Sequence, residues 1–250
     1  MASHRSRRCS IWLPLCLLTL TTACDGGGGH GNSLATSPGG FGLLFDQPDV
    51  QAATAPPLRQ RLDAWTLEAW IVQMQSGSST DTICVEITSQ SILNGAIRLG
   101  VRANGFTLSG LYKAPGSAQT PLKGLAILGE WAHYAMTCDG QILRYYVNGV
   151  LEAADGIYPE TFIADGPIRL GGKGFADFKI DEVRFWNYAR STQQIQDAMS
   201  WRVHPETPGL LLNYQFEKGE GNQFVDSGIL GRHGSFGTVP IKWTEGAPVR

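Results

Sequence analysis

Two adjacent acidic residues, Asp181 and Glu182, are the first candidates for chemistry in this sequence of 250 residues. Hydrolysis of a glycosidic bond by two carboxyl groups requires both groups to flank the same bound sugar. Side chains alternate along a strand, so in a regular strand these two would point to opposite faces of the sheet. Strict alternation therefore predicts that this pair cannot perform such a reaction.

His133 is a candidate general base, but no Ser or Cys that could serve as its nucleophile is apparent. A packing role beside Tyr146 is therefore favoured over a catalytic one. The glycine-rich segment 171–174 lacks the spacing and the Ser or Thr of a phosphate-binding loop, so it is interpreted as a turn. No zinc-ligand spacing occurs in the sequence. We predict no catalytic residue and no enzymatic activity.

Arg144, Tyr146 and His133 could instead bind a ligand, because alternation places all three on one mixed face of two neighbouring strands. Binding sites for small molecules combine aromatic surfaces with a few polar side chains. We therefore predict a ligand-binding role for these three residues, with cross-strand packing as the alternative. Trp186 and Tyr188 are further candidates, but coverage by the helix at 192–200 or by the C-terminal segment is favoured over ligand binding for these two.

The segment 131–152, which must position these residues, is predicted to form three antiparallel strands. Asp139-Gly140 and Asn148-Gly149 are signals for two-residue turns, since Asn or Asp followed by Gly readily adopts positive φ. A two-residue turn at Asp139-Gly140 would place Met136 opposite Leu143. One face of this meander is apolar and is predicted to be buried, as in a sheet of a two-layer sandwich.

Two motifs in the sequence carry a resemblance to a known family. The first is Trp-x-His-x-Ala-x-Thr-x-Asp-Gly with the following Tyr-Val-Asn-Gly, within residues 131–149. The second begins Phe-Lys-Ile-Asp-Glu-Val-Arg-Phe-Trp and occupies residues 178–190. Both resemble the LamG-like jelly-roll family, whose relatives include laminin G domains, pentraxins and concanavalin A-type lectins. The resemblance implies an all-β fold, a two-sheet antiparallel jelly-roll sandwich, over residues 41–245.

Other parts of the sequence agree with this fold. Asn104-Gly105 is a hairpin signal. Ser191 and Gln194 have the spacing of a capping box, which predicts a short helix at 192–200. Further strands are predicted at 41–46, 65–72, 83–87, 168–172 and 210–216.

The resemblance also has implications for sites. Sandwich glucanases of similar fold carry Glu-x-Asp-x-x-Glu on one strand, and this sequence has no such motif. Relatives of this fold often bind Ca²⁺ through oxygen ligands, so a structural Ca²⁺ at Asp46, Asp181 and Asp226 is predicted. The alternative is that Asp46 and Asp226 are turn residues and that Asp181 or Glu182 accepts hydrogen bonds from backbone N–H groups.

The N-terminal segment has the features of an export signal. Residues 1–23 begin with basic residues and continue into a short apolar run. The residues before Cys24 resemble a bacterial lipoprotein signal, in which this cysteine is lipidated; an ordinary cleaved signal peptide is the alternative. Seven of the 16 residues in 25–40 are Gly, so residues 24–40 are predicted to be the lipidated Cys24 followed by a flexible linker. We expect an exported, membrane-anchored lipoprotein of the bacterial cell envelope, or else a secreted protein.

Cys84 and Cys138 are the cysteines that remain outside the signal and the anchor. An even pair in an exported domain favours a disulfide, with two free thiols as the alternative. Strict alternation disagrees with a disulfide, because it places Cys138 on a buried face. It places Cys84 on the face of its strand that lies away from the apolar Ile83 and Val85. A bulge could reconcile the two positions.

Charge and composition limit the classes of function. Without residues 1–23, which hold three Arg and no acid, the chain has 17 basic and 22 acidic residues, a net charge of −5. Such a chain lacks the basic footprint of a nucleic-acid-binding protein. We predict a non-catalytic binding or adhesion module for a glycan or protein partner at the cell surface. The alternatives are an envelope glycoside hydrolase or its accessory domain, and a purely structural envelope protein.

Overall fold

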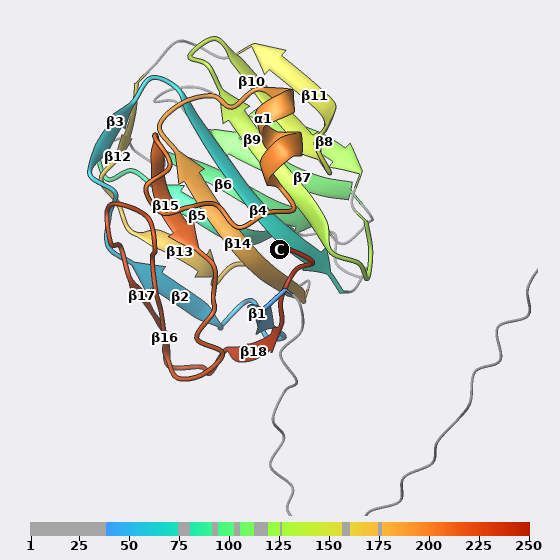
Figure 1. The fold of residues 1–250 in the computed structure, drawn as a ribbon, viewed down its shortest axis with the longest axis vertical. Helices are drawn as coiled ribbons and strands as arrows, with labels where there is room; N and C mark the ends of the chain where they lie inside the picture. The colour runs from blue at the N-terminus through green and yellow to red at the C-terminus, as the bar shows by residue number, and fades with distance from the viewer. Residues whose placement is uncertain are drawn as a thin grey trace, which may run out of the picture. The chain divides into compact units, whose positions relative to one another are not determined.

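Strands dominate the fold, as the alternating sequence predicts (Figure 1). The computed structural model describes residues 39–74, 81–91, 95–102, 106–112, 120–125, 127–156, 161–174 and 177–250. The predicted signal peptide, Cys24, most of the predicted linker and Asn104-Gly105 lie outside the described residues. Strands begin at Phe41 and end at Glu245, and they form two large antiparallel sheets. The all-β jelly-roll sandwich is therefore confirmed.

The first sheet contains the predicted meander and both family motifs. Its strand order is β11-β10-β9-β4-β14-β1-β18, and β15 pairs with β14 beside β1. The strands are β11 (Val150–Gly156), β10 (Ile142–Val147), β9 (Ala132–Cys138), β4 (Trp65–Gln73), β14 (Phe178–Trp186), β1 (Phe41–Phe45), β18 (Lys242–Glu245) and β15 (Leu210–Tyr214).

The second sheet faces the first and has the order β16-β17-β2-β13-β5-β6-β7-β8. A separate two-stranded sheet joins β12 (Phe162–Ala164) to β3 (Gln60–Leu62). The strands of the second sheet are β16 (Gln223–Phe224), β17 (Gly234–Phe236), β2 (Ala52–Ala55), β13 (Ile168–Gly171), β5 (Asp81–Thr88), β6 (Ala96–Arg102), β7 (Phe106–Tyr112) and β8 (Thr120–Leu125).

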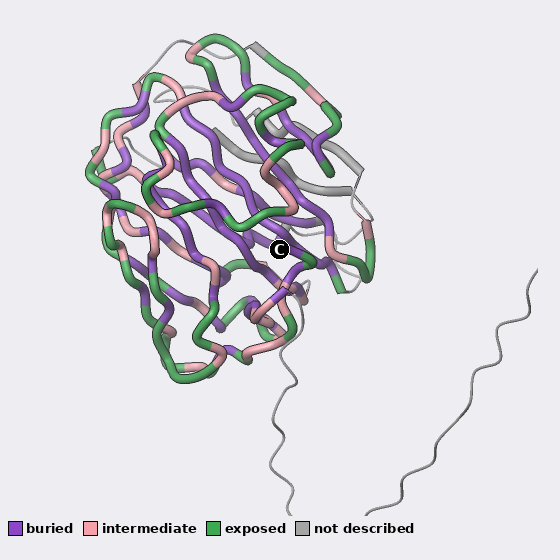
Figure 2. Tube along the Cα trace, in the orientation of Figure 1, coloured by how far each residue is buried: buried purple, intermediate pink, exposed green. Residues whose placement is uncertain are grey.

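The core lies between the two sheets and is built mainly from alternate residues of the strands whose burial the structure describes. Figure 2 shows that the central strands are buried along most of their length. Met136 and Tyr145 contribute to it from the first sheet, and Ile87 and Leu99 from the second. Full burial of each large apolar side chain contributes about 1.5–3 kcal/mol relative to exposure. The alternation recognised in the sequence is therefore the pattern that holds the two layers together.

The meander forms, but its first turn differs from the prediction. Val147 pairs with Val150 across Asn148-Gly149, whose φ values of 48° and 74° are those of the predicted two-residue turn. At the other turn Leu143 pairs with Cys138, not with Met136, so the predicted register is wrong by two residues. The Asp139 carboxylate accepts hydrogen bonds from the N–H groups of Gln141 and Ile142, which stabilises a longer turn.

A helix and two chain segments cover the outer face of the first sheet. Helix α1 (Thr192–Ala198) begins with the predicted capping box, in which Ser191 and Gln194 exchange hydrogen bonds. Its one buried residue, Ile195, packs on Ala135 and Tyr146 of the sheet. We call α1 together with residues 199–203 and 246–250 the cover. No helix among the described residues is long and apolar enough to cross a membrane.

The cover meets the sheet closely at the Asn148-Gly149 turn. Gln196 of α1 donates a hydrogen bond from Nε2 to the Gly149 carbonyl at 2.9 Å. A Cβ at Gly149 would lie 2.6 Å from Gln196 Cγ. Glycine is therefore needed here both for positive φ and for the contact with α1.

Candidate functional site

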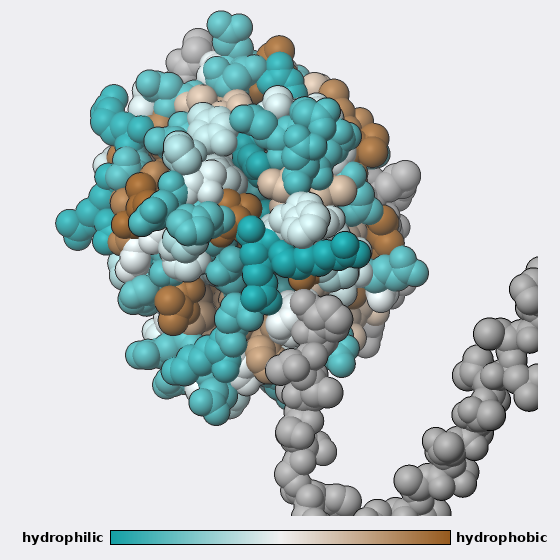
Figure 3. Space-filling view, in the orientation of Figure 1, coloured by the Kyte–Doolittle hydropathy of each residue, from teal (hydrophilic) through white to brown (hydrophobic). Residues whose placement is uncertain are grey.

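The predicted ligand-binding face lies beneath the cover, whose outer surface at α1 is hydrophilic (Figure 3). Tyr146 is 2% exposed and packs against Ile195. His133 is 1% exposed, and its ring meets Trp70 edge-on, with 5.6 Å between ring centroids. This burial contradicts a sugar-binding role for His133 and Tyr146 on the folded protein and agrees with the alternative of cross-strand packing.

Arg144, the third residue of the predicted ligand site, differs from the other two because it is exposed to solvent. It is partly exposed and donates to the Asp139 carboxylate at 2.6 Å. The structure therefore does not bring the three residues together around an open surface.

The cover encloses a group of charged and aromatic side chains that we call the covered cluster. Its centre is the Glu68 carboxylate, which accepts hydrogen bonds from Arg190 at 2.8 Å and from Trp186 Nε1 at 3.0 Å. Its members come from β4, β9, β14 and the segment before α1: Glu68, His133, Arg184, Trp186 and Arg190. All are buried, so the cluster has no room for a substrate.

The electrostatics of the covered cluster follow from this burial. Burial opposes ionisation of Glu68, but the nearby Arg190, His133 and Arg184 together hold the pKa of its carboxyl below the usual range. Burial also lowers the pKa of His133 to about 4, although Glu68 acts in the opposite direction. Neither ring nitrogen of His133 has a hydrogen-bond partner among the described residues. His133 is therefore neutral at pH 7 and serves as a packing residue.

Asp181 and Glu182 lie on the same face, contrary to the prediction from strict alternation. The register of β14 against β4 shifts between Asp181 and Arg184, and Glu182 has φ of 49°. This bulge lets Ile180 and Val183 both enter the core, so the two acids between them lie on the outer side. Both are buried, and burial raises the pKa of each carboxyl. The pair is closed to a substrate, for a different reason from the one predicted.

The three aspartates predicted to bind calcium are each held by donors of the protein. Asp46 accepts from Gln51 Nε2 at 2.9 Å and pairs with Lys242. Asp181 accepts from the N–H groups of Glu182 and Ala247 at 2.7 and 2.8 Å.

Asp226 accepts hydrogen bonds from the N–H groups of Asn213, Gly228 and Arg232 at 2.7–2.8 Å. Among the described residues no group of three His, Cys, Asp or Glu is arranged to hold a metal ion. As placed, the three aspartates do not fit one common site, and calcium binding stays a prediction.

Cys84 and Cys138 are free thiols, so the predicted disulfide is not formed. A bulge in β5 between Ile83 and Val85 turns Cys84 into the core, which resolves the conflict with alternation. Burial raises the pKa of the Cys84 thiol well above its ordinary value and that of Cys138 to about 11, so both stay protonated at neutral pH.

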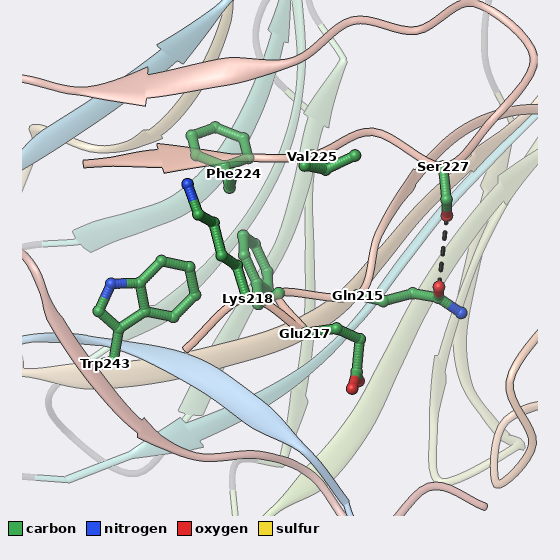
Figure 4. A pocket seen from close by; sticks show the side chains of 8 residues that line it. Gln215, Glu217, Lys218, Phe224, Val225, Ser227 and Trp243 are labelled. Carbon is green, nitrogen blue, oxygen red and sulfur yellow. Dashed lines mark hydrogen bonds between the residues drawn. The ribbon is translucent and has the colours of Figure 1, made fainter. Parts of the chain in front are cut away.

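A hollow of about 170 Å³ lies where the edges of the two sheets meet, and the sequence did not reveal it (Figure 4). Phe224 of β16 and Trp243 of β18 come from edge strands of the two sheets, and the chain after β15 completes the wall. We call it the aromatic hollow, lined by Gln215, Phe216, Glu217, Lys218, Phe224, Val225, Ser227 and Trp243.

The aromatic residues of this hollow are fixed in place. Trp243 donates a hydrogen bond from Nε1 to the Gly221 carbonyl at 3.0 Å. Its ring packs against Phe236, and Phe236 stacks on Phe224, with centroid separations of 5.6 and 6.0 Å. Phe224 in turn packs against Phe216 in the floor. The chain of rings therefore connects a partly exposed Trp243 to the core without a flexible link.

The polar residues of the hollow stand around these rings. Figure 4 shows Lys218 beside Trp243 and Phe224, and Gln215 joined to Ser227, whose Oγ donates to Gln215 Oε1 at 3.3 Å. Glu217 forms an ion pair with Arg202 at 2.6 Å. One sequence feature could have pointed to this hollow: Trp243 is an aromatic residue among the polar residues Lys242, Thr244 and Glu245. The sequence does not show, however, that the fold brings Trp243 close to Phe224.

Comparison with known proteins agrees with this architecture. The sequence model of the concanavalin A-like lectin/glucanases superfamily matches residues 47–196. A curated relative, pappalysin-1 of Mus musculus, is 30% identical over 98 residues, which cover 36% of this chain but only 6% of pappalysin-1.

Two solved structures share the fold. A Bacteroides ovatus protein proposed to bind carbohydrate superposes with a TM-score of 0.62 at 19% identity, over 84% of this chain and 61% of that one. A heptameric SAP-like pentraxin of Limulus polyphemus gives a TM-score of 0.50 at 15% identity, over 65% of this chain and 82% of that one. At these identities the two likenesses bear on the fold alone; the match to the superfamily model confirms the resemblance stated from the motifs.

Proposed function

Because this chain belongs to the concanavalin A-like lectin/glucanases superfamily, we propose that it is a non-catalytic module that binds a carbohydrate. The carbohydrate binds in the aromatic hollow. The observation that carries the proposal is the partly exposed Trp243, fixed by its hydrogen bond to Gly221, with Lys218 beside it and Gln215 elsewhere in the wall of the same hollow (Figure 4). Fixed aromatic surfaces with a few convergent polar groups are typical of small-molecule sites. The proposed role of the Bacteroides ovatus relative supports the same class of ligand.

The size of the aromatic hollow limits what it holds. Typical drug-sized sites have volumes of about 300–1,000 Å³, and this hollow has about 170 Å³. It suits one sugar residue, with its apolar face on Trp243 and its hydroxyl groups toward Gln215 and Lys218. Because Trp243 is already fixed by Gly221 and Phe236, little side-chain entropy is lost when the sugar binds.

The carboxylates near the hollow support a binding role rather than hydrolysis. Glu217 is the one acid that lines it among the described residues, and it is paired with Arg202 at 2.6 Å. A glycosidase requires two carboxyl groups about 5–9.5 Å apart across the scissile bond. Asp181 and Glu182, two further acids close enough to sense the charge of Glu217, are buried.

A glycan array followed by calorimetry tests the proposal. We expect a carbohydrate to bind the wild-type protein and Trp243→Phe, and to lose most of its affinity for Trp243→Ala. Trp201→Ala is the matched control, because Trp201 is 54% exposed and does not line the hollow. A blank array, or equal binding to Trp243→Ala and the wild type, would contradict the proposal. Turnover of β-glucans that disappears in Glu217→Gln would favour the enzyme alternative instead.

We also propose that the module is held at the bacterial cell envelope by a lipidated Cys24. The basic and apolar order of residues 1–23 and the glycine-rich residues that follow support this. Labelling with a radioactive fatty acid in a bacterial host should mark the wild-type protein and not Cys24→Ser. Equal labelling of the two would count against an anchor at this residue.

We propose calcium binding independently of carbohydrate binding. The placement of Asp46, Asp181 and Asp226 does not support a shared site, so any calcium would use fewer of them together with backbone carbonyls. A melting temperature that rises on adding calcium and returns with a chelator would support it, whereas an unchanged melting temperature would speak against it.

A further inference from the structure

A row of charged side chains crosses the outer face of the second sheet. Arg98 of β6, Glu86 of β5 and Arg169 of β13 are paired directly across neighbouring strands. Their neighbours along each strand, such as Val85 and Ile87, face the core, so alternation directs all three away from it. No part of the cover lies here, because α1 packs on the other sheet.

The Glu86 carboxylate holds three cations in place. It accepts a hydrogen bond from Arg98 Nε at 2.5 Å, from Arg169 at 3.3 Å, and from Lys173 of the turn after β13 at 3.3 Å. Burial opposes ionisation of Glu86, but Arg98 and Lys173 keep the pKa of its carboxyl below the usual range. Glu86 is therefore negatively charged at neutral pH and fixes the cations around it.

One carboxylate does not neutralise three cations. The four side chains sum to a charge of +2, and they line a hollow of about 300 Å³ together with the neutral residues Thr88 and Gln90. The side chains of Arg169 and Lys173 are 42% and 52% exposed, so much of their donor capacity faces solvent. Asp165 does not line the hollow, and its carboxylate accepts hydrogen bonds from the Ser89 and Ser91 hydroxyl groups and from the Gln90 N–H.

We infer that this cationic hollow, formed by Glu86, Arg98, Arg169 and Lys173, binds an oxyanion group. Guanidinium and ammonium groups that converge on one hollow match the oxygens of a carboxylate, sulfate or phosphate. The group could belong to an acidic saccharide or be a free anion, and the chemistry of recognition is the same. Glu86 is a positioning residue, because it orients the cations without touching the anion. The inference does not depend on sugar binding in the aromatic hollow.

Calorimetric titration of the full chain tests the inference, with sodium sulfate, inorganic phosphate, a galacturonate oligosaccharide and a neutral oligosaccharide of equal length. We expect at least one anionic probe to bind, more weakly as sodium chloride is added. Lys173→Gln and Arg169→Ala should each weaken binding by about tenfold or more, the range expected for loss of charge-assisted hydrogen bonds. Tighter binding of galacturonate identifies the saccharide as the source, and equal binding of the inorganic ions identifies a free anion.

Arg144→Ala is the matched control, because Arg144 is partly exposed and does not line the cationic hollow. Trp243→Ala should leave anion binding unchanged, so failure of the sugar-binding proposal is distinguishable from failure of this one. Thermal melting of Lys173→Gln verifies that the variant folds, which its exposed position leads us to expect. The inference is overturned if none of the anionic probes binds, or if both variants bind them as the wild type does.

Discussion

Glu68 on the first sheet and Glu86 on the second have similar partners but opposite surroundings. Each is an acid in an inner strand, and each is paired with two arginines: Arg184 and Arg190 for the first, Arg98 and Arg169 for the second. The cover closes the first group completely, whereas the second lines an open hollow. The difference shows that the same residue types are structural or available for binding according to what packs over them.

The strongest test of this comparison removes each carboxylate in turn. Glu68→Gln leaves two buried guanidinium groups without their countercharge, so we expect a loss of about 3–5 kcal/mol in the free energy of unfolding. Glu86→Gln should cost less, about 1–3 kcal/mol, because Glu86 is also buried but two of its three cations, Arg169 and Lys173, reach solvent. Denaturant unfolding measures both, and equal losses would break the distinction between the faces.

The pH dependence of stability gives the next largest effect. The folded pKa of His133 is about 4 against a usual value of 6.5, so between these values the unfolded chain binds a proton that the folded chain does not. Stability should therefore fall as the pH drops from 6.5 toward 4, by on the order of 3 kcal/mol.

The control for this effect is His133→Gln, which lacks the titrating group. Asp181 and Glu182 have raised pKa values and act with the opposite sign, because the folded chain then holds protons that the unfolded chain has lost. The difference between wild type and His133→Gln cancels their contribution. A difference that does not change between pH 6.5 and pH 4 would show that His133 is not buried as a neutral ring.

A smaller loss is expected when the cover is loosened. Ile195→Ala removes the one buried residue of α1, so we expect a loss of about 2 kcal/mol, at the lower end for such truncations because α1 lies at the periphery. Hydrogen exchange should then increase at the Gly149 turn and not at β5 or β6. Exchange that increases equally in both sheets would mean that the cover is not a local element.

The smallest effect should come from Arg144→Ala. Its ion pair with Asp139 is short at 2.6 Å, but both side chains are partly exposed. We expect about 0.5 kcal/mol, decreasing with added salt. A loss as large as that of Glu68→Gln would show that exposure does not separate the two kinds of ion pair.

The sequence was sufficient for the features that depend on local pattern. Alternation identified the buried face of the meander, and Asn148-Gly149 and Ser191-x-x-Gln194 identified a turn and a helix start. The error at Asp139-Gly140 was a shift of two residues, which preserves the face of every side chain because the strand period is two. The prediction of the core was therefore insensitive to that error.

Features that depend on partners distant in sequence could not be predicted. The bulge that brings Asp181 and Glu182 to one face exists only in the register of β14 against β4. Alternation placed His133 and Tyr146 on the outer face correctly, but it contained nothing to show that Ile195 would cover them. Likewise, Trp243 and Phe224 form a hollow only because edge strands of different sheets meet there.

The most direct test asks whether the ligand binds at the aromatic hollow and not under the cover. It is a ¹H–¹⁵N NMR titration with the carbohydrate selected on the array, read at the tryptophan indole N–H signals. The indole groups of Trp70 and Trp186 lie under the cover, bonded to the Met199 carbonyl and to Glu68, and that of Trp243 borders the aromatic hollow. We predict that the Trp243 signal moves with ligand concentration while the Trp70 and Trp186 signals stay fixed. Movement of the two covered signals with Trp243 unchanged would contradict the account.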